Sequence, residues 1–317
     1  MNEAPGPRVL ILGLPYFGTM LGEVLRDRGW DARFLKHPGR SPAAWLAVLA
    51  AVMRADLLYL VSARLERGSP LDRLLRWWRV PAVVHWVGTD VLIASDAHRA
   101  GKLSEVVART ATHWADAPWL IGELREMGIR SEVVPLPVPG IADEAPPLPA
   151  VFRVLFYLPV DAFDREVFEM ETMLRLPLEM PEVEFVLIPS TAETLPGPLP
   201  PNLSARGWVT DMDELYREIS VLARLVSHDG MPFMVLEALS RGRHVVYSYE
   251  LPGVVAARGY DAVREAVAQL YEAHKRGELG LNETGRQWVR ETHAFGPAAD
   301  TIDGKLRDVL KRHASRE

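Results

Sequence analysis

The sequence predicts an α/β protein made of two doubly wound halves, each with a parallel sheet. Short apolar runs alternate with helical segments, and the alternation stops once, at a proline-rich stretch. Apolar strands separated by helices are typical of parallel sheets covered on both faces. A length of 317 residues suits about two domains. We therefore expect one domain over residues 1–140 and a second over residues 150–295.

In the first half, apolar runs of four to six residues predict buried strands. They are residues 8–13, 32–35, 57–61, 82–86 and 132–136. The segments between them carry apolar residues at helical spacing, which predicts helices. These are residues 18–28, 42–53, 70–78 and 119–127.

The two halves are separated by residues 135–149, which contain six prolines and are predicted to be a linker. The alternation then resumes with strands expected at residues 152–158, 183–188, 222–227 and 245–249. Helices are expected at residues 164–176, 211–219, 233–241, 260–275, 283–292 and 297–313.

Composition excludes several classes of function. The chain has no cysteine, which excludes disulfides and thiolate chemistry. A net charge of −6 does not suit a nucleic-acid-binding protein. The longest apolar run, residues 43–53, is too short to span a bilayer, and the N-terminus has no basic segment followed by an apolar core. A cytoplasmic location is the expectation.

The segment from Ser227 to Gly242 is the most informative part of the chain. It places Asp229 and Glu237 eight positions apart, across a Gly-Met-Pro turn and a helix start that follow a strand. Asp229 is therefore expected at the carboxyl edge of the sheet, and Glu237 within the first half of the helix. Backbone N–H groups at such a helix start can hold a phosphate.

This segment resembles the donor-binding motif of the retaining GT-B glycosyltransferases of family 4, in which two acids stand in the same spacing. Here the first acid is Asp229 instead of the usual glutamate. The resemblance implies two Rossmann-like domains facing across a cleft, with a last helix, residues 296–317, that crosses back to the first domain. It implies a metal-independent hexosyltransferase of the EC 2.4 class that needs no cofactor. Its substrates would be a nucleoside-diphosphate sugar and a glycan or lipid-linked acceptor.

By this resemblance, Asp229 bonds the donor sugar and Glu237 bonds the ribose. The main chain of Gly207 and Val209 would contact the nucleotide base of the donor. Gly18, from the first domain, would approach the donor diphosphate. The phosphate-binding helix start comprises Gly230, Met231, Pro232, Phe233 and Met234. A nicotinamide site at residues 13–18 is disfavoured, because Pro15 replaces the middle glycine of the dinucleotide fingerprint.

On the acceptor side, His85 and Asp90 belong to a His-Trp-Val-Gly-Thr-Asp segment that ends a strand and is similar to a family 4 segment. Two interpretations stay open: His85 and Asp90 act on the acceptor, or His85 is a buried core histidine and Asp90 caps the next helix. The Asp-Met-Asp sequence at residues 211–213 is interpreted as a helix cap and not as a metal site.

One family feature is absent. The Arg/Lys pair that neutralises the leaving diphosphate has no counterpart after the strand at residues 152–158. Arg165 is the nearest cation, and a solvated helix position is its alternative interpretation. Arg153, Arg206 or a first-domain residue could supply the charge instead. The gap keeps two other functions open: a noncatalytic subunit that binds a partner transferase or a glycan, and a sugar-nucleotide epimerase.

A basic and aromatic segment, residues 64–79, contains Arg64, Arg67, Arg73, Arg76 and Arg79 among leucines and tryptophans. Such a surface helix can contact an anionic membrane, which here would be its inner face. The alternative is an ordinary helix that packs Leu and Trp on its own sheet and leaves the arginines in water.

Overall fold

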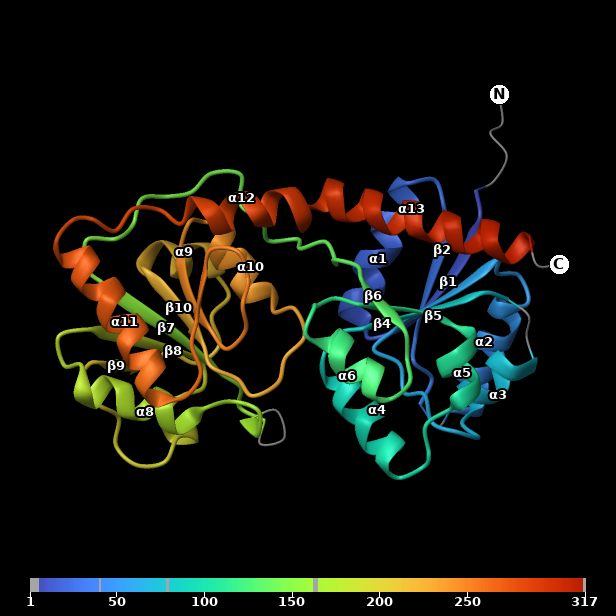
Figure 1. Cartoon of the computed structure of the whole chain (residues 1–317), viewed down its shortest axis with the longest axis horizontal. Helices are drawn as coiled ribbons and strands as arrows, with labels where there is room; N and C mark the ends of the chain where they lie inside the picture. The colour runs from blue at the N-terminus through green and yellow to red at the C-terminus, as the bar shows by residue number, and fades with distance from the viewer. Residues whose placement is uncertain (1–5, 40, 78–79, 162–164, 316–317) are drawn as a thin grey trace. The chain divides into compact units, whose positions relative to one another are not determined.

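The computed structural model describes residues 6–39, 41–77, 80–161 and 165–315. The chain divides into two compact units (Figure 1). Unit 1 consists of Met1–Pro137 together with Phe295–Glu317, and unit 2 consists of Val138–Ala294. Each unit contains one six-stranded parallel sheet with helices between the strands, which confirms the predicted α/β class.

Unit 1 is built on a sheet of strand order β2-β1-β3-β4-β5-β6. Strand β3 is fully buried, as expected for an apolar strand covered on both faces. The strands are β1 (Arg8–Gly13), β2 (Asp31–Lys36), β3 (Leu57–Val61), β4 (Ala82–Trp86), β5 (Thr112–Ala115) and β6 (Ser131–Val133). Strand β5 was missing from the sequence prediction, because its four residues are too few to give an alternation pattern.

The helices of unit 1 include two that the sequence did not predict, α4 and α5. Polar residues interrupt the apolar spacing of α4, whereas α5 has only six residues. The helices are α1 (Pro15–Asp27), α2 (Pro42–Val52), α3 (Pro70–Trp77), α4 (Thr89–Arg99), α5 (Glu105–Thr110), α6 (Leu120–Glu126) and α13 (Phe295–Ala314).

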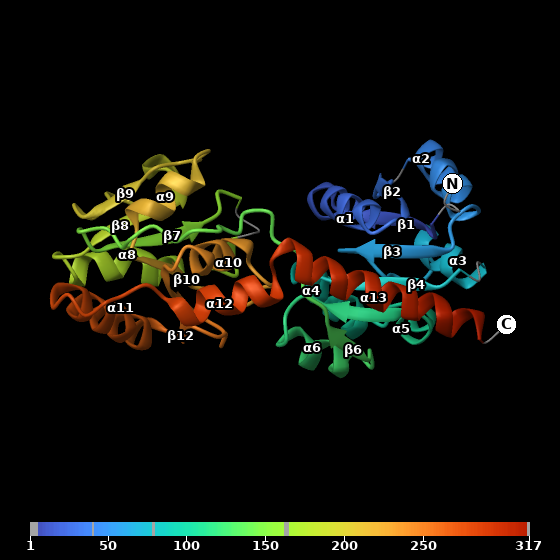
Figure 2. The same cartoon turned by 90° about the horizontal axis from the view of Figure 1, so that it is seen from above.

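The last helix, α13, packs within unit 1 although it follows unit 2 in the chain (Figure 2). The indole Nε1 of Trp30 donates to Oδ1 of Asp303 over 2.6 Å. Lys305 forms an ion pair with Glu132 on β6 at 2.6 Å. These bonds join α13 to two segments far apart in sequence.

Unit 2 has the strand order β12-β11-β10-β7-β8-β9, in which the first strand, β7, lies between β10 and β8. The connections therefore reverse direction between β7 and β10, which is the position where doubly wound sheets bind ligands. The strands are β7 (Arg153–Leu158), β8 (Glu184–Pro189), β9 (Leu203–Ala205), β10 (Val221–Arg224), β11 (His244–Tyr247) and β12 (Val254–Ala256).

The helices of unit 2 follow the predicted positions except at the first one. The sequence predicted a helix over residues 164–176, whereas α8 begins at Met170 and ends at Glu179. Arg165 is itself helical but is separated from α8 by a turn at residues 166–167, and residue 164 falls outside the described residues. The elements are α8 (Met170–Glu179), the 3₁₀ turn η1 (Ala192–Thr194), α9 (Met212–Glu218), α10 (Phe233–Ser240), α11 (Tyr260–Lys275) and α12 (Glu283–Thr292).

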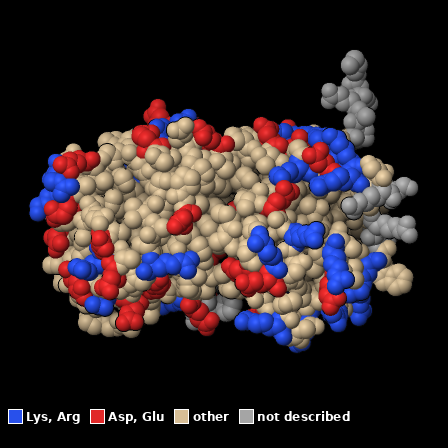
Figure 3. All heavy atoms as spheres, in the orientation of Figure 1, with Lys and Arg blue, Asp and Glu red and all other residues tan. Residues whose placement is uncertain are grey.

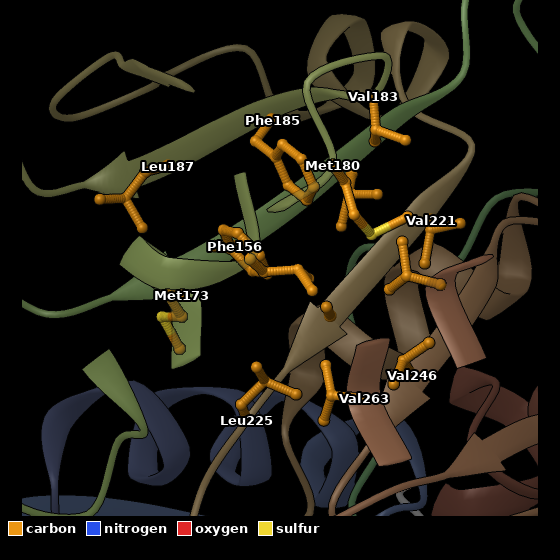
Figure 4. Close-up of a cluster of buried hydrophobic side chains, with 14 of the residues drawn as sticks. Phe156, Met173, Met180, Val183, Phe185, Leu187, Val221, Leu225, Val246 and Val263 are labelled. Atoms are coloured by element: carbon orange, nitrogen blue, oxygen red, sulfur yellow. The ribbon is translucent and has the colours of Figure 1, made fainter. Parts of the chain in front are cut away.

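An apolar core fixes the sheet of unit 2 against α8 and α11 (Figure 4). Phe156 on β7 and Phe185 on β8 stack with ring centroids 5.3 Å apart. Met173 of α8 and Val263 of α11 are both buried in the same cluster. This core also contains residues of β7 and β10, so it holds these two strands in place.

The proline-rich segment between the two predicted domains is bound to unit 2, and we call residues 138–149 the proline strap. Arg241 donates to the carbonyl of Gly140 over 2.7 Å, and Arg286 donates to the carbonyl of Asp143 over 2.9 Å. Arg243 donates to the carbonyl of Pro147 over 3.1 Å. The strap is therefore held along its length by three arginines.

Candidate functional site

The two acids singled out in the sequence lie on the loop and the helix that follow strand β10 of the unit 2 sheet. Strand β10 ends at Arg224, and the loop that follows carries Asp229 before α10 begins at Phe233. Glu237 is on the second turn of α10. Because β10 borders the position where the connections reverse, this loop and helix occupy the usual ligand-binding edge of such a sheet.

Asp229 is held by two neighbours from adjacent strands. Nε of Arg224 donates to Oδ2 of Asp229 over 2.6 Å, and Nη2 donates to Oδ1 over 3.1 Å. The hydroxyl of Tyr247 donates to Oδ2 over 3.1 Å. The two charged side chains are only 12% and 14% exposed, so this is a largely buried bidentate pair.

Arg224 is a site residue that the sequence reasoning missed. It is the last residue of β10 and pairs in register with Tyr247, the last residue of β11. Its guanidinium lies 5.3 Å from the ring centroid of Tyr157 and 5.2 Å from that of Phe168. A single cation in an otherwise apolar strand sequence, Val-Leu-Ala-Arg-Leu-Val, was the signal that could have identified it.

Glu237 is half-buried and is bonded by a tyrosine. The hydroxyl of Tyr216, on α9, donates to Oε2 of Glu237 over 2.8 Å. Burial raises the pKa of the Glu237 carboxyl, against the hydrogen bond from Tyr216 and the charge of Arg241. The strap passes beside this carboxyl, since a Cβ on Gly140 would lie 2.9 Å from Oε1 of Glu237.

The start of α10 is suited to an anion by its backbone. Its N-cap residue is Pro232, and no side chain caps the helix. Gly230, Met231 and Pro232 are buried, whereas Phe233 and Met234 are half-buried. The first-turn N–H groups of a helix without a side-chain cap are oriented toward its N-terminal end, where the helix dipole favours negative charge.

The segment predicted to contact a base lies after β9. Gly207 has a positive φ of +69° and donates its N–H to the carbonyl of Ser190 over 3.2 Å. Val209 is half-buried, two residues farther on. Asp211 then caps α9 by accepting from the N–H of Glu214 over 2.9 Å, which confirms the helix-cap interpretation.

Arg165 lies at the same edge of the sheet and bonds to protein oxygens. Nη1 donates to the carbonyl of Thr194 over 2.8 Å, and Nη2 donates to Oγ of Ser190 over 2.9 Å. Nε donates to the carbonyl of Pro159 over 2.5 Å. The guanidinium therefore joins the segments that follow β7 and β8 and places a positive charge there.

The other two cations considered in unit 2 are paired with carboxylates. Arg153 is the first residue of β7, at the opposite edge of the sheet, and pairs with Glu184 at 2.6 Å. Arg206 pairs with Glu218 at 2.7 Å. The position of Arg153 removes it from the carboxyl edge, where a diphosphate would bind.

In unit 1, the structure places His85 in the core. The imidazole is 0% exposed, and its two nitrogens bond the hydroxyl of Tyr59 at 2.7 Å and the carbonyl of Val134 at 3.0 Å. Burial lowers the pKa of His85 to about 3, so the ring is neutral at physiological pH. These contacts fit the buried-histidine alternative and leave neither nitrogen facing solvent.

Asp90 and Gly18 are also buried within unit 1. Oδ1 of Asp90 accepts from the N–H of Val87 over 3.0 Å, in the first turn of α4. Gly18 lies inside α1, where a Cβ would come within 2.1 Å of the Phe34 ring. Gly18 therefore allows α1 to pack closely on β2, and a contact between this glycine and a donor stays a prediction.

Comparison with known proteins rests on structure, since no protein-family model and no curated protein matches the sequence. The sucrose-phosphate synthase of Thermosynechococcus elongatus aligns with a TM-score of 0.71 at 11% identity, over 96% of this chain and 100% of that chain. The lipopolysaccharide outer core galactosyltransferase WaaB aligns with a TM-score of 0.63 at 11% identity, over 95% and 99%.

A third solved structure is the pneumococcal O-GlcNAc transferase GtfA in complex with UDP and GlcNAc. It aligns with a TM-score of 0.51 at 10% identity, over 80% of this chain and 57% of that chain. Two Rossmann-like units of six parallel strands in one chain, aligned over nearly full length with such enzymes, define the architecture. The chain has the GT-B fold, the fold of these glycosyltransferases.

Proposed function

We propose that this protein is a glycosyltransferase that moves a sugar from a nucleoside-diphosphate sugar to an acceptor hydroxyl. Transfer would proceed with retention of anomeric configuration and without a metal ion. The observation that supports the proposal is that Asp229 lies on the loop after β10, at the carboxyl edge of the unit 2 sheet, and Glu237 lies on the second turn of the helix that starts there, α10. The GT-B fold supports the same reaction class.

Each part of the site has a task in this reaction. Glu237 would accept hydrogen bonds from the ribose hydroxyls, and Asp229 would accept them from the donor sugar. The start of α10, which has no side-chain cap, would hold the diphosphate, whose negative charge increases as the glycosidic bond breaks. Arg165 is fixed at the same edge and would contribute positive charge, in the absence of the usual Arg/Lys pair.

A thermal-shift panel tests the donor site directly. The panel contains UDP-, GDP-, ADP- and TDP-sugars with their free diphosphates, without added metal. A ligand that binds only the folded protein raises the unfolding midpoint, so we expect a clear rise with one nucleotide base. No rise with any of them would contradict a donor site and favour the noncatalytic subunit. Release of an altered donor without any acceptor would identify the epimerase.

We also propose that unit 1 contacts an anionic membrane surface, which would supply a lipid-linked acceptor. Helix α2 and its C-cap residue expose Leu46, Leu49 and Met53 at 67%, 40% and 61%, on one face at helical spacing. Residues 33–79 contain nine Lys and Arg against three Asp and Glu, in a chain of net charge −6. An apolar helix face within a basic region suits binding at the lipid headgroup level.

The basic side chains gather over the part of unit 1 that carries α3 and α5 (Figure 3). Trp77 at the end of α3 is 83% exposed, and Arg76 pairs with the buried Asp72. Residues 78 and 79 lie outside the described residues. Among the described residues, no helix is both long enough and apolar enough to cross a membrane.

Replacing both Leu46 and Leu49 by Glu tests the membrane contact. We expect the variant to lose at least about tenfold in partitioning onto vesicles of phosphatidylcholine and phosphatidylglycerol, since two buried leucines are lost and two negative charges gained. Wild-type binding should weaken with salt and without phosphatidylglycerol. Leu178→Glu, on a 65% exposed leucine of unit 2, is the matched control. Unchanged partitioning of the double variant onto the vesicles would contradict the proposal.

A further inference from the structure

The ion pair between Arg224 and Asp229 is the feature of this site that the two-acid motif does not explain. Arg224 is the last residue of β10, five residues before Asp229. The loop between them therefore folds back and brings the Asp229 carboxylate onto the Arg224 guanidinium. The pair is largely buried and bidentate, and Tyr247 bonds the same carboxylate. A surface ion pair of two long side chains would be far less fixed.

The loop between the two charges is itself fixed by neighbouring segments. The N–H of Ser227 donates to the carbonyl of Val167 over 2.7 Å, and the N–H of Val226 donates to Oγ of Ser248 over 2.9 Å. The hydroxyl of Tyr249 donates to the carbonyl of Ser227 over 3.1 Å. The backbone before Asp229 is thus held in place, and Arg224 determines which way the carboxylate points.

This arrangement matters because aspartate is one methylene shorter than glutamate. A shorter side chain must be carried to its ligand by the backbone and held there, since a misplacement of about 1 Å can cost a hundredfold in rate. The planar guanidinium bonds both carboxylate oxygens and so fixes the plane as well as the direction of the group. Lysine could supply the charge, but it could not fix this plane.

We propose that Arg224 is a positioning residue that orients Asp229 to bind the sugar part of the donor. The inference rests on the proposed function and adds the residue on which recognition of the sugar depends. Arg224 acts through Asp229, whereas Glu237 and the start of α10 bind the nucleotide independently of it. The affinity for the sugar and the affinity for the nucleotide are therefore separable in this site.

The test compares the affinities for a nucleoside-diphosphate sugar and for the free diphosphate of the same base. The base is the one, among UDP, GDP, ADP and TDP, whose ligands bind the wild-type protein. We expect Arg224→Met to weaken binding of the sugar nucleotide about tenfold and to leave the affinity for free diphosphate unchanged. Asp229→Asn should do the same, and the double variant should be no worse than either single variant. Arg224→Lys should recover only part of the loss.

Arg175 provides the matched control. It pairs with Glu179 of the same helix, α8, at 2.9 Å and lies 3.7 Å from the ring centroid of Tyr260 on α11, in an exposed Arg-carboxylate-Tyr group away from the site. Arg175→Met should change neither affinity. If Arg224→Met lowered both affinities equally, or neither, Arg224 would be only a structural residue. If wild type bound no member of any pair, the proposed function itself would be wrong.

Discussion

Replacing Glu237 by Ala is expected to remove most of the affinity for the nucleotide while leaving the protein folded. In the proposed site this carboxylate accepts hydrogen bonds from the ribose. A hydrogen bond to a charged group contributes about 1.5–3 kcal/mol, which corresponds to a loss of about 10- to 100-fold in affinity. Titration calorimetry with the base that stabilises wild type in the thermal-shift panel measures this loss.

The unfolding midpoint of ligand-free Glu237→Ala should remain close to that of wild type. Burial already raises the pKa of this carboxyl, so its ionised form is less favoured in the folded protein than in water. Glu265→Ala, on the exposed face of α11, is the control for loss of a negative charge. An unchanged nucleotide affinity in Glu237→Ala, with wild type binding normally, would contradict the ribose assignment.

The raised pKa of Glu237 also predicts a pH dependence with a definite sign. Ribose binding needs the ionised carboxylate, which is fully present above the raised pKa and is lost as the pH falls through it. As the pH is lowered, the affinity for the nucleotide sugar should therefore begin to fall while the pH is still above 4.5, the ordinary pKa of glutamate. Glu237→Gln should be weaker and should lack this dependence, whereas a fall at the same pH in both proteins would point to another group.

The fold could be predicted because most of its strands carry a direct sequence signal. Strands such as β1 and β3 are apolar and buried, and their helices have apolar residues at helical spacing. The missed strands β5, β9 and β12 have three or four residues, which is too short for a pattern. The helix placed at residues 164–176 is interrupted: Arg165 is helical, the chain then turns at residues 166–167, and α8 begins only at Met170.

The candidate site was predicted only in the part that lies within one stretch of sequence. Asp229, Glu237 and the start of α10 come from a strand-loop-helix unit, so their relative positions follow from local structure. Tyr216 and Tyr247 reach the two acids from other elements, and strand register brings Tyr247 beside Arg224. Register and side-chain direction depend on tertiary packing, which a single sequence does not display.

The proline strap illustrates the same limit, since its composition indicates only a linker. Its own sequence contains no sign of the arginines that bind it, because Arg241, Arg243 and Arg286 lie about a hundred residues or more away. Prolines leave their carbonyls without the regular partners of a helix or sheet, and buried carbonyls need donors. Three guanidinium groups provide them, so the strap becomes part of unit 2.

Arg243→Met is therefore expected to destabilise unit 2 strongly. The side chain of Arg243 is 0% exposed and donates to the carbonyls of Pro146, Pro147 and Ile219. Burial lowers the pKa of Arg243 to about 10, so the group is still charged at neutral pH. Methionine keeps an apolar stem but supplies no donor, and leaving these carbonyls unbonded should cost about 3 kcal/mol.

Urea unfolding, followed together with proteolysis within the strap, measures this change in unit 2. We expect a lower unfolding midpoint and faster cleavage between residues 138 and 149, because the strap loses the anchor that bonds the carbonyls of Pro146 and Pro147. Arg276→Met, which removes an exposed pair with Glu278, is the control and should change the midpoint little. Gly140 of the strap lies beside the Glu237 side chain. A loosened strap should therefore weaken nucleotide binding as well. A stable Arg243→Met protein with unchanged strap cleavage would mean that the other bonds to the strap, from Arg241, Arg286 and His274, are enough to hold it.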